Sequence, residues 1–209
     1  MGQIIDKENI FRNALIKGLI DSGVKFSNRR EYPDVNYGLI IKPLNMDYNF
    51  REPIRMFFKG YPFHIGVIRN DKIYSFCPDL LEPHRGTIYK DIIIESLNEW
   101  ENGEIFWFLR QGIEYPKIEA RLIDLIQVVH KLLDLAEFNR RHHTSLKAEY
   151  NLLSNNCTDV AMTVLIGETR CFQIEAVADT IVKLSNIDEI RAMIPEYAKI
   201  WLQDFKYLK

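Results

Sequence analysis

The sequence predicts an α+β fold in which an antiparallel sheet is followed by helices. Apolar residues recur at helical spacing near the start of the chain, read as strands through its middle, and return to helical spacing after Tyr115-Pro116. A block of strands between helices is typical of an antiparallel sheet with segregated helices. The 209 residues suffice for one domain with a substantial core, so a single domain is expected over 1–209.

The first helix is expected within residues 1–25, with Asp6 as its N-cap and Gly23 as its end. The polar stretch FSNRREYPDVNY that follows is expected to be irregular, and it leads into a short strand, GLIIK. The apolar residues of the helix share one face: Ile10, Phe11, Leu15, Leu19 and Ile20.

Residues 54–107 carry the strand signals. FHIGVI and KIYSFC flank Arg69-Asn70-Asp71, which indicates a hairpin. If the turn centres on Asn70-Asp71, Gly66 faces Ser75 and His64 faces Cys77. PDLLEPHRG is expected to be a loop, and TIYKDIIIE and EIFWFLR are expected to be further strands.

The second half of the chain predicts helices. Arg140-Arg141-His142-His143 is expected to lie in a solvated loop, and a helix is expected from about Cys157 to Ile166, with Asn155 or Asn156 as N-cap and Gly167 just beyond its end. Two or three helices are expected to close the chain over 171–209, the last with Pro195 in its first turn. Before these, one long helix is expected from the shared face of Ile118, Leu122, Leu125, Ile126, Val129, Leu133 and Ala136.

Composition excludes several classes of protein. The formal charge of −2 and the lack of a basic stripe give no reason to expect a nucleic-acid partner. No run of eighteen apolar residues predicts a membrane span. The three cysteines lack zinc-site spacing, and we expect reduced thiols, no metal and no cofactor. Without the apolar core of a secretory signal, the chain is expected to be cytoplasmic, or secreted by a specialised system without a cleavable signal peptide.

Cys157 falls in the first turn of its predicted helix. Unpaired N–H groups and the positive end of the helix dipole favour a thiolate there, and the same N–H groups could hold an oxyanion. Asp159 in the same turn would oppose the thiolate if it lay close. A small core cysteine is the alternative interpretation, and the thiol needs a base before it counts as a site.

Five histidines are candidates for that base. His64 is the best of them, because it interrupts the apolar run of a strand that should be half buried, where an unpartnered imidazole is costly. Gly66 is expected to leave open space beside the ring. The remaining histidines are expected to be surface or satisfied side chains: His84, His130, His142 and His143.

These motifs resemble the circularly permuted branch of the papain-like, NlpC-type cysteine hydrolases, in which the histidine precedes the nucleophilic cysteine. HIG, YSFCPD, Gly86 and YNLLSNNCTD are similar to a branch found among bacterial toxins and effectors. The resemblance covers about 54–170, which it marks as the core, and omits the first fifty residues and the C-terminal helices. It implies a permuted papain-like fold whose sheet packs against the nucleophile helix.

The resemblance also implies the roles of particular residues. Cys157 matches the nucleophile and His64 the general base of a thiol protease or amidase, with the Cys157 main-chain N–H and the Asn156 cap at the oxyanion end of the helix. Acyltransferase-like members place another polar residue on the returning strand of the hairpin. Here Asp79 could orient His64, and Ser75 or a main-chain carbonyl would also serve. Cys77 is expected to be an inert core residue.

The implied substrate is a peptide, an isopeptide or a peptidoglycan-type bond, with an immunity or host protein as a partner. Two other functions stay open on the sequence. One is a thiol acyltransferase of the lecithin retinol acyltransferase-like type. The other is a non-catalytic, partner-binding domain on the same fold.

Overall fold

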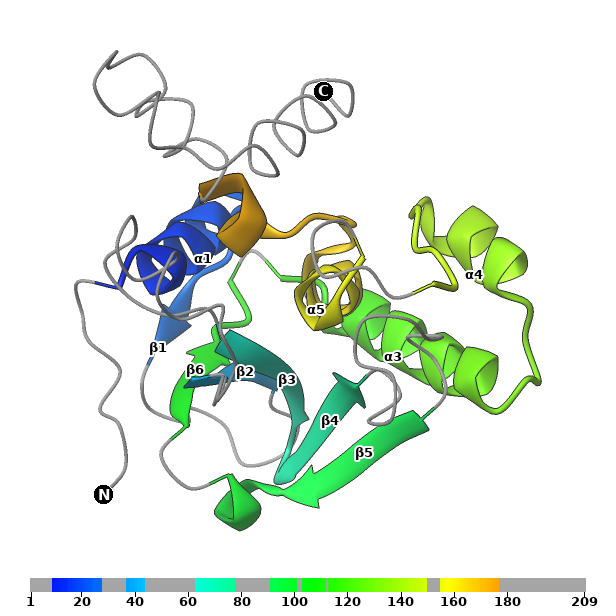
Figure 1. Cartoon of the computed structure of the whole chain (residues 1–209), viewed down its shortest axis with the longest axis horizontal. Coiled ribbons are helices and arrows are strands. Elements are labelled where there is room, and N and C mark those ends of the chain that lie inside the picture. The colour runs from blue at the N-terminus through cyan, green and yellow to red at the C-terminus, as the bar shows by residue number, and fades with distance from the viewer. Residues whose placement is uncertain are drawn as a thin grey trace, which may run out of the picture.

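The computed structural model of the chain describes residues 9–27, 37–43, 63–77, 91–100, 103–111, 113–149 and 155–176. They form a six-stranded sheet in the order β1-β6-β2-β3-β4-β5, antiparallel at every pairing, with helices packed against it (Figure 1). The prediction of an α+β fold with an antiparallel sheet is confirmed. The strands are β1 Phe26–Ser27, β2 Tyr37–Pro43, β3 Phe63–Arg69, β4 Lys72–Cys77, β5 Asp91–Ser96 and β6 Glu104–Phe108. The helices are α1 Ile10–Asp21, α3 Tyr115–Val129, α4 Leu135–His142 and α5 Cys157–Ile166, with a 3-10 turn, η1, at Leu97–Glu99.

The two faces of the sheet bury different sets of side chains, because successive residues of a strand point to opposite faces. On β3, Phe63, Ile65 and Val67 join the main core beneath α1, α3 and α5. The opposite face carries a smaller apolar cluster, to which β3 contributes Ile68. The full smaller cluster is Ile40, Ile68, Ile73, Trp100 and Trp107.

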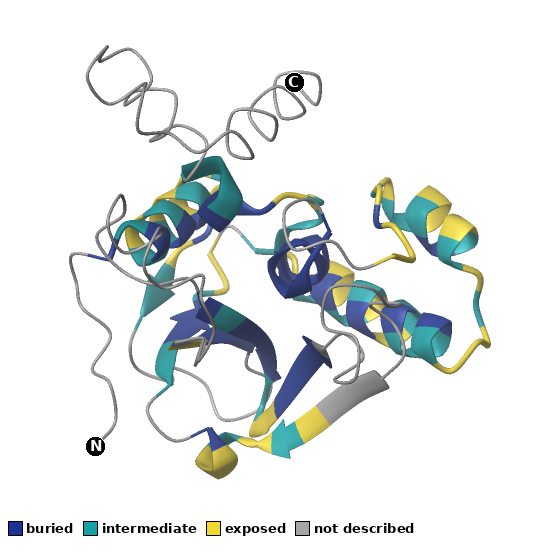
Figure 2. Ribbon diagram, in the orientation of Figure 1, coloured by how far each residue is buried: buried dark blue, intermediate teal, exposed yellow. Residues whose placement is uncertain are grey.

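Helix α5 lies at the centre of the molecule. Every residue from Cys157 to Leu165 is buried, and only Ile166 is partly exposed, so the ribbon of α5 is dark blue almost throughout in Figure 2. A helix that is buried all round must be covered on several sides. The sheet and α3 both contact it, and Arg121 of α3 closes its C-terminal end by donating from Nε to the Val164 carbonyl at 2.8 Å.

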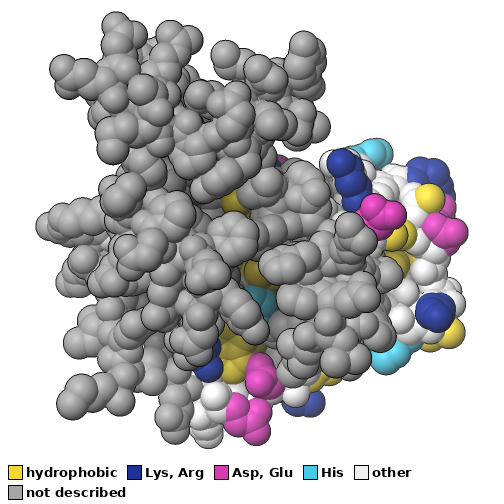
Figure 3. Space-filling view, in the orientation of Figure 1, with side chains coloured by type: hydrophobic (Ala, Val, Ile, Leu, Met, Phe, Trp, Pro, Cys, Tyr) yellow, Lys and Arg dark blue, Asp and Glu magenta, His cyan; other side chains and the backbone are white. Residues whose placement is uncertain are grey.

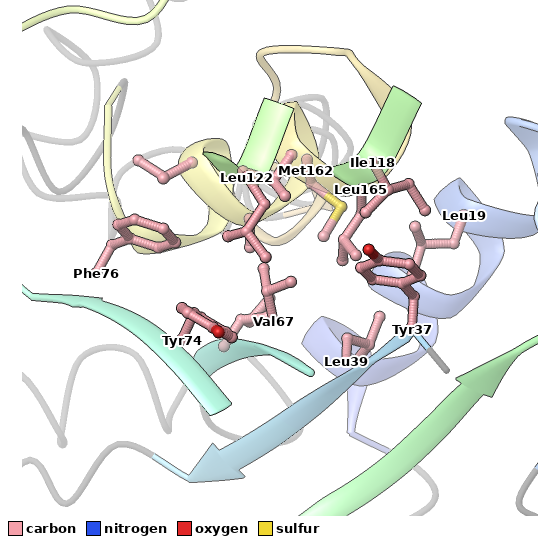
Figure 4. Close-up of a cluster of buried hydrophobic side chains, with 14 of the residues drawn as sticks. Leu19, Tyr37, Leu39, Val67, Tyr74, Phe76, Ile118, Leu122, Met162 and Leu165 are labelled. Atoms are coloured by element: carbon pink, nitrogen blue, oxygen red, sulfur yellow. The ribbon is translucent and has the colours of Figure 1, made fainter. Parts of the chain in front are cut away.

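The main core fills the space between the sheet and these helices. In Figure 4, Met162 and Leu165 of α5 lie beside Ile118 and Leu122 of α3, above the side chains of the strands. Tyr37 reaches into the same layer, and its ring packs edge-on against Tyr115 with ring centroids 5.1 Å apart. The sheet therefore holds α5 through apolar contacts along the length of the helix.

Helix α1 begins later than the sequence predicted. Its N-cap is Asn9, whose Oδ1 accepts a hydrogen bond from the Phe11 N–H at 2.9 Å, whereas the expected cap, Asp6, lies outside the described residues. Gly23 follows the helix with φ of 86°, as its expected role at the helix end requires. Part of the stretch expected to be irregular is a strand, because Phe26–Ser27 pairs with β6.

The expected hairpin is confirmed. Asn70 and Asp71 form the turn between β3 and β4, and Gly66 pairs with Ser75. The pairing of β3 with β4 ends at that point, so the predicted facing of His64 and Cys77 is not part of the ladder. The strand expected from TIYKDIIIE is described as Asp91–Ser96, and that from EIFWFLR ends at Phe108.

The single long helix predicted after Pro116 is wrong: two helices occupy that segment. Helix α3 ends at Val129, and Lys131 adopts a left-handed conformation with φ of 58°. Asp134 then caps α4 by accepting a hydrogen bond from the Ala136 N–H at 2.7 Å. A local cap therefore overrides the apolar spacing that would have continued the helix.

The basic cluster expected in a loop is helical instead, since Arg140, Arg141 and His142 form the last turn of α4. Cations are favoured there by the negative end of the helix dipole. His142 also bonds Asp124 of α3, with Nε2 and Oδ2 2.9 Å apart. Figure 3 shows acidic, basic and histidine side chains interspersed around the α3–α4 end of the molecule.

Several predictions fall outside the described residues: the loop at 78–86, the start of the strand at 87–90, and the C-terminal helices beyond residue 176. Within the described part, a helical segment begins at Phe172. No helix among the described residues is both long enough and apolar enough to cross a membrane. The core at 54–170 and the two flanking helical regions stay predictions.

Candidate functional site

Cys157 is the first residue of α5, where the sequence placed it. Asn156 is the N-cap, and its Oδ1 accepts a hydrogen bond from the Thr158 N–H at 2.8 Å. Asp159 completes a capping box by accepting from the Asn156 N–H at 2.9 Å. Gly167, at φ of 78°, ends the helix as predicted. The NNCTD stretch therefore folds as a doubly capped helix start.

The Cys157 thiol is buried against strand β3. Its pKa is raised to about 11, chiefly by burial and in part by the nearby Asp159 charge. Hydrogen bonds with the main chain of Ile65 and with Thr158 act in the other direction. The expected thiolate is not the resting form, because desolvation outweighs the N–H groups that would stabilise it, and the thiol is protonated at neutral pH.

Strands β3 and β4 separate close to the Cys157 thiol. Because β3 leaves β4 after the Gly66–Ser75 pair, the main chain at the start of β3 needs other partners. Gln173 supplies them for Phe63: its Oε1 accepts from the Phe63 N–H at 2.9 Å, and its Nε2 donates to the Phe63 carbonyl at 3.1 Å. The buried amide thus takes the place of a neighbouring strand.

Gln173 also ties this strand to α5. Its Nε2 donates a second hydrogen bond, 2.9 Å long, to Thr158 Oγ1. Phe63 precedes His64 and Thr158 follows Cys157, so one side chain links the neighbours of both candidate residues. Both N–H groups of the amide are used by these bonds, which leaves Gln173 none to offer an oxyanion.

His64 lies on β3 with its ring directed to Ser75 and Trp100. Nε2 of the imidazole is 2.5 Å from Ser75 Oγ, and the ring centroids of His64 and Trp100 are 5.6 Å apart. Ser75, one of the partners proposed for His64 from the sequence, therefore holds one ring nitrogen. Asp79, the other side chain proposed for this role, lies outside the described residues.

The open space predicted beside His64 is filled. A Cβ on Gly66 would overlap Ile73 Cγ2 and lie 3.1 Å from Trp100 Cη2. Glycine is needed here because the second apolar cluster packs directly on the main chain of β3. The Trp100 ring in turn is fixed by a hydrogen bond from its Nε1 to Glu95.

Cys157 and His64 meet through the main chain of β3. Only a donor to sulfur lowers the pKa of a thiol, so the hydrogen bond with Ile65 comes from its N–H, which belongs to the peptide unit joining His64 to Ile65. The sulfur therefore lies against the main chain of His64. The His64 imidazole itself leaves β3 on the opposite face, toward Trp100 of the second apolar cluster.

Asn156 acts as a cap, as predicted, and its amide Nδ2 is 3.5 Å from the sulfur of Cys171. That position does not assign it to an oxyanion. Cys171 is a second buried thiol, and burial raises its pKa to about 12. The side chain of Cys77 and all of His84 lie outside the described residues. Of the other histidines, His130 and His143 are exposed at helix ends, and His142 pairs with Asp124.

Gln173, Trp100 and the neighbouring Lys42 were not found from the sequence. None of them has a local motif, because each reaches the site through a contact between segments distant in the chain. In the described part of the chain, no group of three His, Cys, Asp or Glu side chains could hold a metal ion.

Comparison of the chain with models of known protein families, with curated proteins and with solved structures gave no match.

Proposed function

We propose that this protein is a cysteine-dependent amidase or peptidase with Cys157 as its nucleophile and His64 as its general base. One observation carries the proposal: Cys157, the first residue of α5, lies beside Ile65, the residue that follows His64 on β3, where the two elements pack together. The first residue of a capped helix and a histidine-bearing strand are thereby in direct contact. That juxtaposition is what the resemblance to permuted papain-like hydrolases implies.

The mechanism requires the imidazole to reach the sulfur. Ser75 and Trp100 hold the His64 ring on the face of the sheet opposite α5, so the ring would have to turn toward the edge of β3 that β4 leaves open to take the thiol proton. The sulfur would then attack the carbonyl carbon of an amide, and main-chain N–H groups at the start of α5, including that of Cys157, would meet the oxyanion.

The remaining steps return the enzyme to its starting state. The carbon–nitrogen bond breaks, and the amine leaves with the proton from His64, which gives a thioester on Cys157. Water attacks that thioester as His64 takes its proton, and the carboxylic acid leaves as the thiol is restored. Because the resting thiol is protonated, the thiolate forms only as the base removes the proton during attack.

The substrate class follows from the resemblance alone. We propose a peptide, isopeptide or peptidoglycan-type bond as the substrate and a bacterial effector or toxin as the context, with an immunity or host protein as partner. A second acyl acceptor in place of water would turn the same thioester chemistry into that of an acyltransferase.

The test is to incubate the protein with peptidoglycan fragments and with ubiquitin-like conjugates in parallel. Cleavage of one class is expected, and Cys157→Ala should lower its rate by about three orders of magnitude or more. Cys171→Ala is the matched control, because Cys171 is a buried thiol beside the same helix cap and should retain activity. Full cleavage by Cys157→Ala, or cleavage of neither class, would contradict the proposal.

A non-catalytic, partner-binding domain is the second candidate, and one observation favours it. Cys157 is only 8% exposed, and burial raises the pKa of its thiol to about 11. Catalytic thiols normally have a lowered pKa and partial exposure. Under this alternative, Cys157→Ala keeps the full biological effect of the protein and Cys157 is not labelled by thiol-directed probes.

A further inference from the structure

Lys42 lies directly beside the candidate base. It pairs with His64 across the β2–β3 ladder, so the two side chains leave the same face of the sheet with their Cβ atoms roughly 5 Å apart. Lys42 is exposed, and its Nζ lies 5.9 Å from the centroid of the Trp100 ring. The indole of Trp100 therefore lies close to both the imidazole of His64 and the ammonium of Lys42.

The ammonium of Lys42 is not neutralised by a carboxylate in the described part of the chain. Two other cationic side chains at the sheet do form ion pairs with carboxylates: Arg12 pairs with Glu104, and Arg69 pairs with Glu119. The carboxylate of Glu95, which contacts the same indole, is engaged by the indole N–H of Trp100. Lys42 therefore places a positive charge next to His64, and a cation–π contact with the Trp100 ring stabilises its position.

We propose that Lys42 binds a carboxylate of the substrate close to the bond that is cleaved, and so makes the enzyme selective for acidic substrates. This inference rests on the proposed function of Cys157 and His64. An ammonium offers three N–H donors and forms short, charge-assisted hydrogen bonds with carboxylates.

The position of the Lys42 side chain fits this role. The Cys157 sulfur lies beside the peptide unit after His64, and Lys42 is the residue opposite His64 on the neighbouring strand. Lys42 leaves the sheet on the same face as the imidazole, so a substrate that contacts His64 also passes the Lys42 ammonium.

Two small alkylating agents test the inference without knowledge of the natural substrate. Iodoacetate and iodoacetamide place nearly the same carbon on a thiol, but only iodoacetate carries a carboxylate. The rate of each reaction at Cys157 is measured by mass spectrometry of the peptide that contains it, at low ionic strength. The ratio of the iodoacetate rate to the iodoacetamide rate reports the attraction of a carboxylate, and the iodoacetamide rate reports access to the thiol.

Lys42→Met is expected to lower that ratio by about three- to tenfold, with the iodoacetamide rate unchanged, and added salt should shrink the difference. Lys42→Arg keeps the charge and should keep the ratio. Lys72→Met is the matched control, since Lys72 is exposed at the hairpin end of β4, opposite Arg69 and far along the ladder from His64. It should leave the ratio unchanged.

A further pair of probes identifies the source of the carboxylate. A peptidyl chloromethyl ketone with a glutamyl side chain, compared with its glutaminyl analogue, presents an acidic side chain, whereas iodoacetate presents a terminal carboxylate. If Lys42→Met loses the preference for the acidic probe in just one of these two pairs, that pair identifies the kind of carboxylate that Lys42 recognises. If the ratio of acidic to neutral probe is unchanged in Lys42→Met for both pairs while Cys157 still reacts, the inference is wrong and the proposed function is unaffected. Failure of every probe to label Cys157 overturns both.

Discussion

Asp159 is a carboxylic acid in the buried first turn of α5, where it accepts a hydrogen bond from the Asn156 N–H. Burial raises its pKa to about 6, from an ordinary value of 3.8. Its charge also raises the pKa of Cys157 and of Cys171. One side chain therefore serves the helix cap and opposes the formation of thiolate at both buried cysteines.

This shift makes the stability of the protein depend on pH. Between the ordinary pKa of Asp159 and its folded value of about 6, the folded chain binds a proton that the unfolded chain does not. The contribution of Asp159 to the free energy of unfolding is therefore largest below its ordinary pKa. It falls as pH rises through the folded pKa and does not change further above that value. The loss is of the order of 3 kcal/mol, since each unit of pKa corresponds to about 1.4 kcal/mol.

Asp159→Asn should remove this dependence, because the amide keeps an oxygen for the Asn156 N–H and carries no charge. We expect the free energy of unfolding at mildly alkaline pH to rise by about 1–3 kcal/mol, less any cost of placing the new NH2 group. Urea denaturation at pH values from about 4 to 8 measures it. Asp134→Asn, at the exposed cap of α4, is the control and should leave the slope in place. An unchanged slope in Asp159→Asn would show that this carboxylate titrates normally.

At the scale of single residues, the sequence was sufficient to place Cys157, its Asn156 cap and the Gly167 terminus, because caps are local and depend on a few neighbouring side chains. It was not sufficient for the protonation state of the thiol. The pKa of Cys157 depends on how many other segments cover the sulfur, and that is a property of the packed molecule.

At the scale of elements, the join between β3 and α5 depends on Gln173. Gln173→Leu removes three hydrogen bonds and leaves the buried N–H and carbonyl of Phe63 without that partner. We expect the free energy of unfolding to fall by about 2–4 kcal/mol. Chemical denaturation measures this loss. Gln127→Leu, at a half-buried glutamine on α3, is the matched control and should cost less than about 1 kcal/mol.

Gln173→Glu separates the hydrogen bonds from the shape of the side chain. A carboxylate would face the Phe63 carbonyl and Thr158 Oγ1 without an N–H to donate, whereas a protonated carboxyl offers one donor. The variant should therefore regain stability as pH falls. Under the proposed function, it should also lower the turnover rate more than the apparent affinity for substrate, because Gln173 contacts the neighbours of Cys157 and His64. Equal stability of both variants and the native protein at every pH would contradict this role.

The elements themselves were predicted unevenly. The β3–β4 hairpin and α5 were found because their signals are local, namely a two-residue turn and a pair of caps. The break between α3 and α4 was missed, although Asp134 with Glu137 three residues later carries the pattern of a helix start. Apolar spacing continued through the break, and the local cap decided the outcome.

At the scale of the whole molecule, long-range pairing defines the site. Strand β6 inserts between β1 and β2, and Gln173, 110 residues from Phe63 in the sequence, completes the edge of β3 that β4 leaves open. Neither arrangement follows from a local pattern, since both join segments many residues apart. The contact between Cys157 and the strand of His64 was expected only because the order of motifs resembles known hydrolases.

The position of α5 at the centre of the molecule predicts how the protein opens. Its residues from Val160 to Leu165 are buried between the sheet and α3, whereas α4 buries only Phe138 and attaches through polar contacts such as those of Asn139 with Leu146. Amides inside α5 should therefore exchange with solvent only on global unfolding, and those of α4 through local openings at least about 2 kcal/mol less costly. Native-state hydrogen exchange at increasing denaturant measures both. Exchange of the α5 amides at the α4 free energy would mean that α5 detaches as a unit. The resting burial of Cys157 would then be a property of the closed state alone, and substrate access to the sulfur would be set by that detachment.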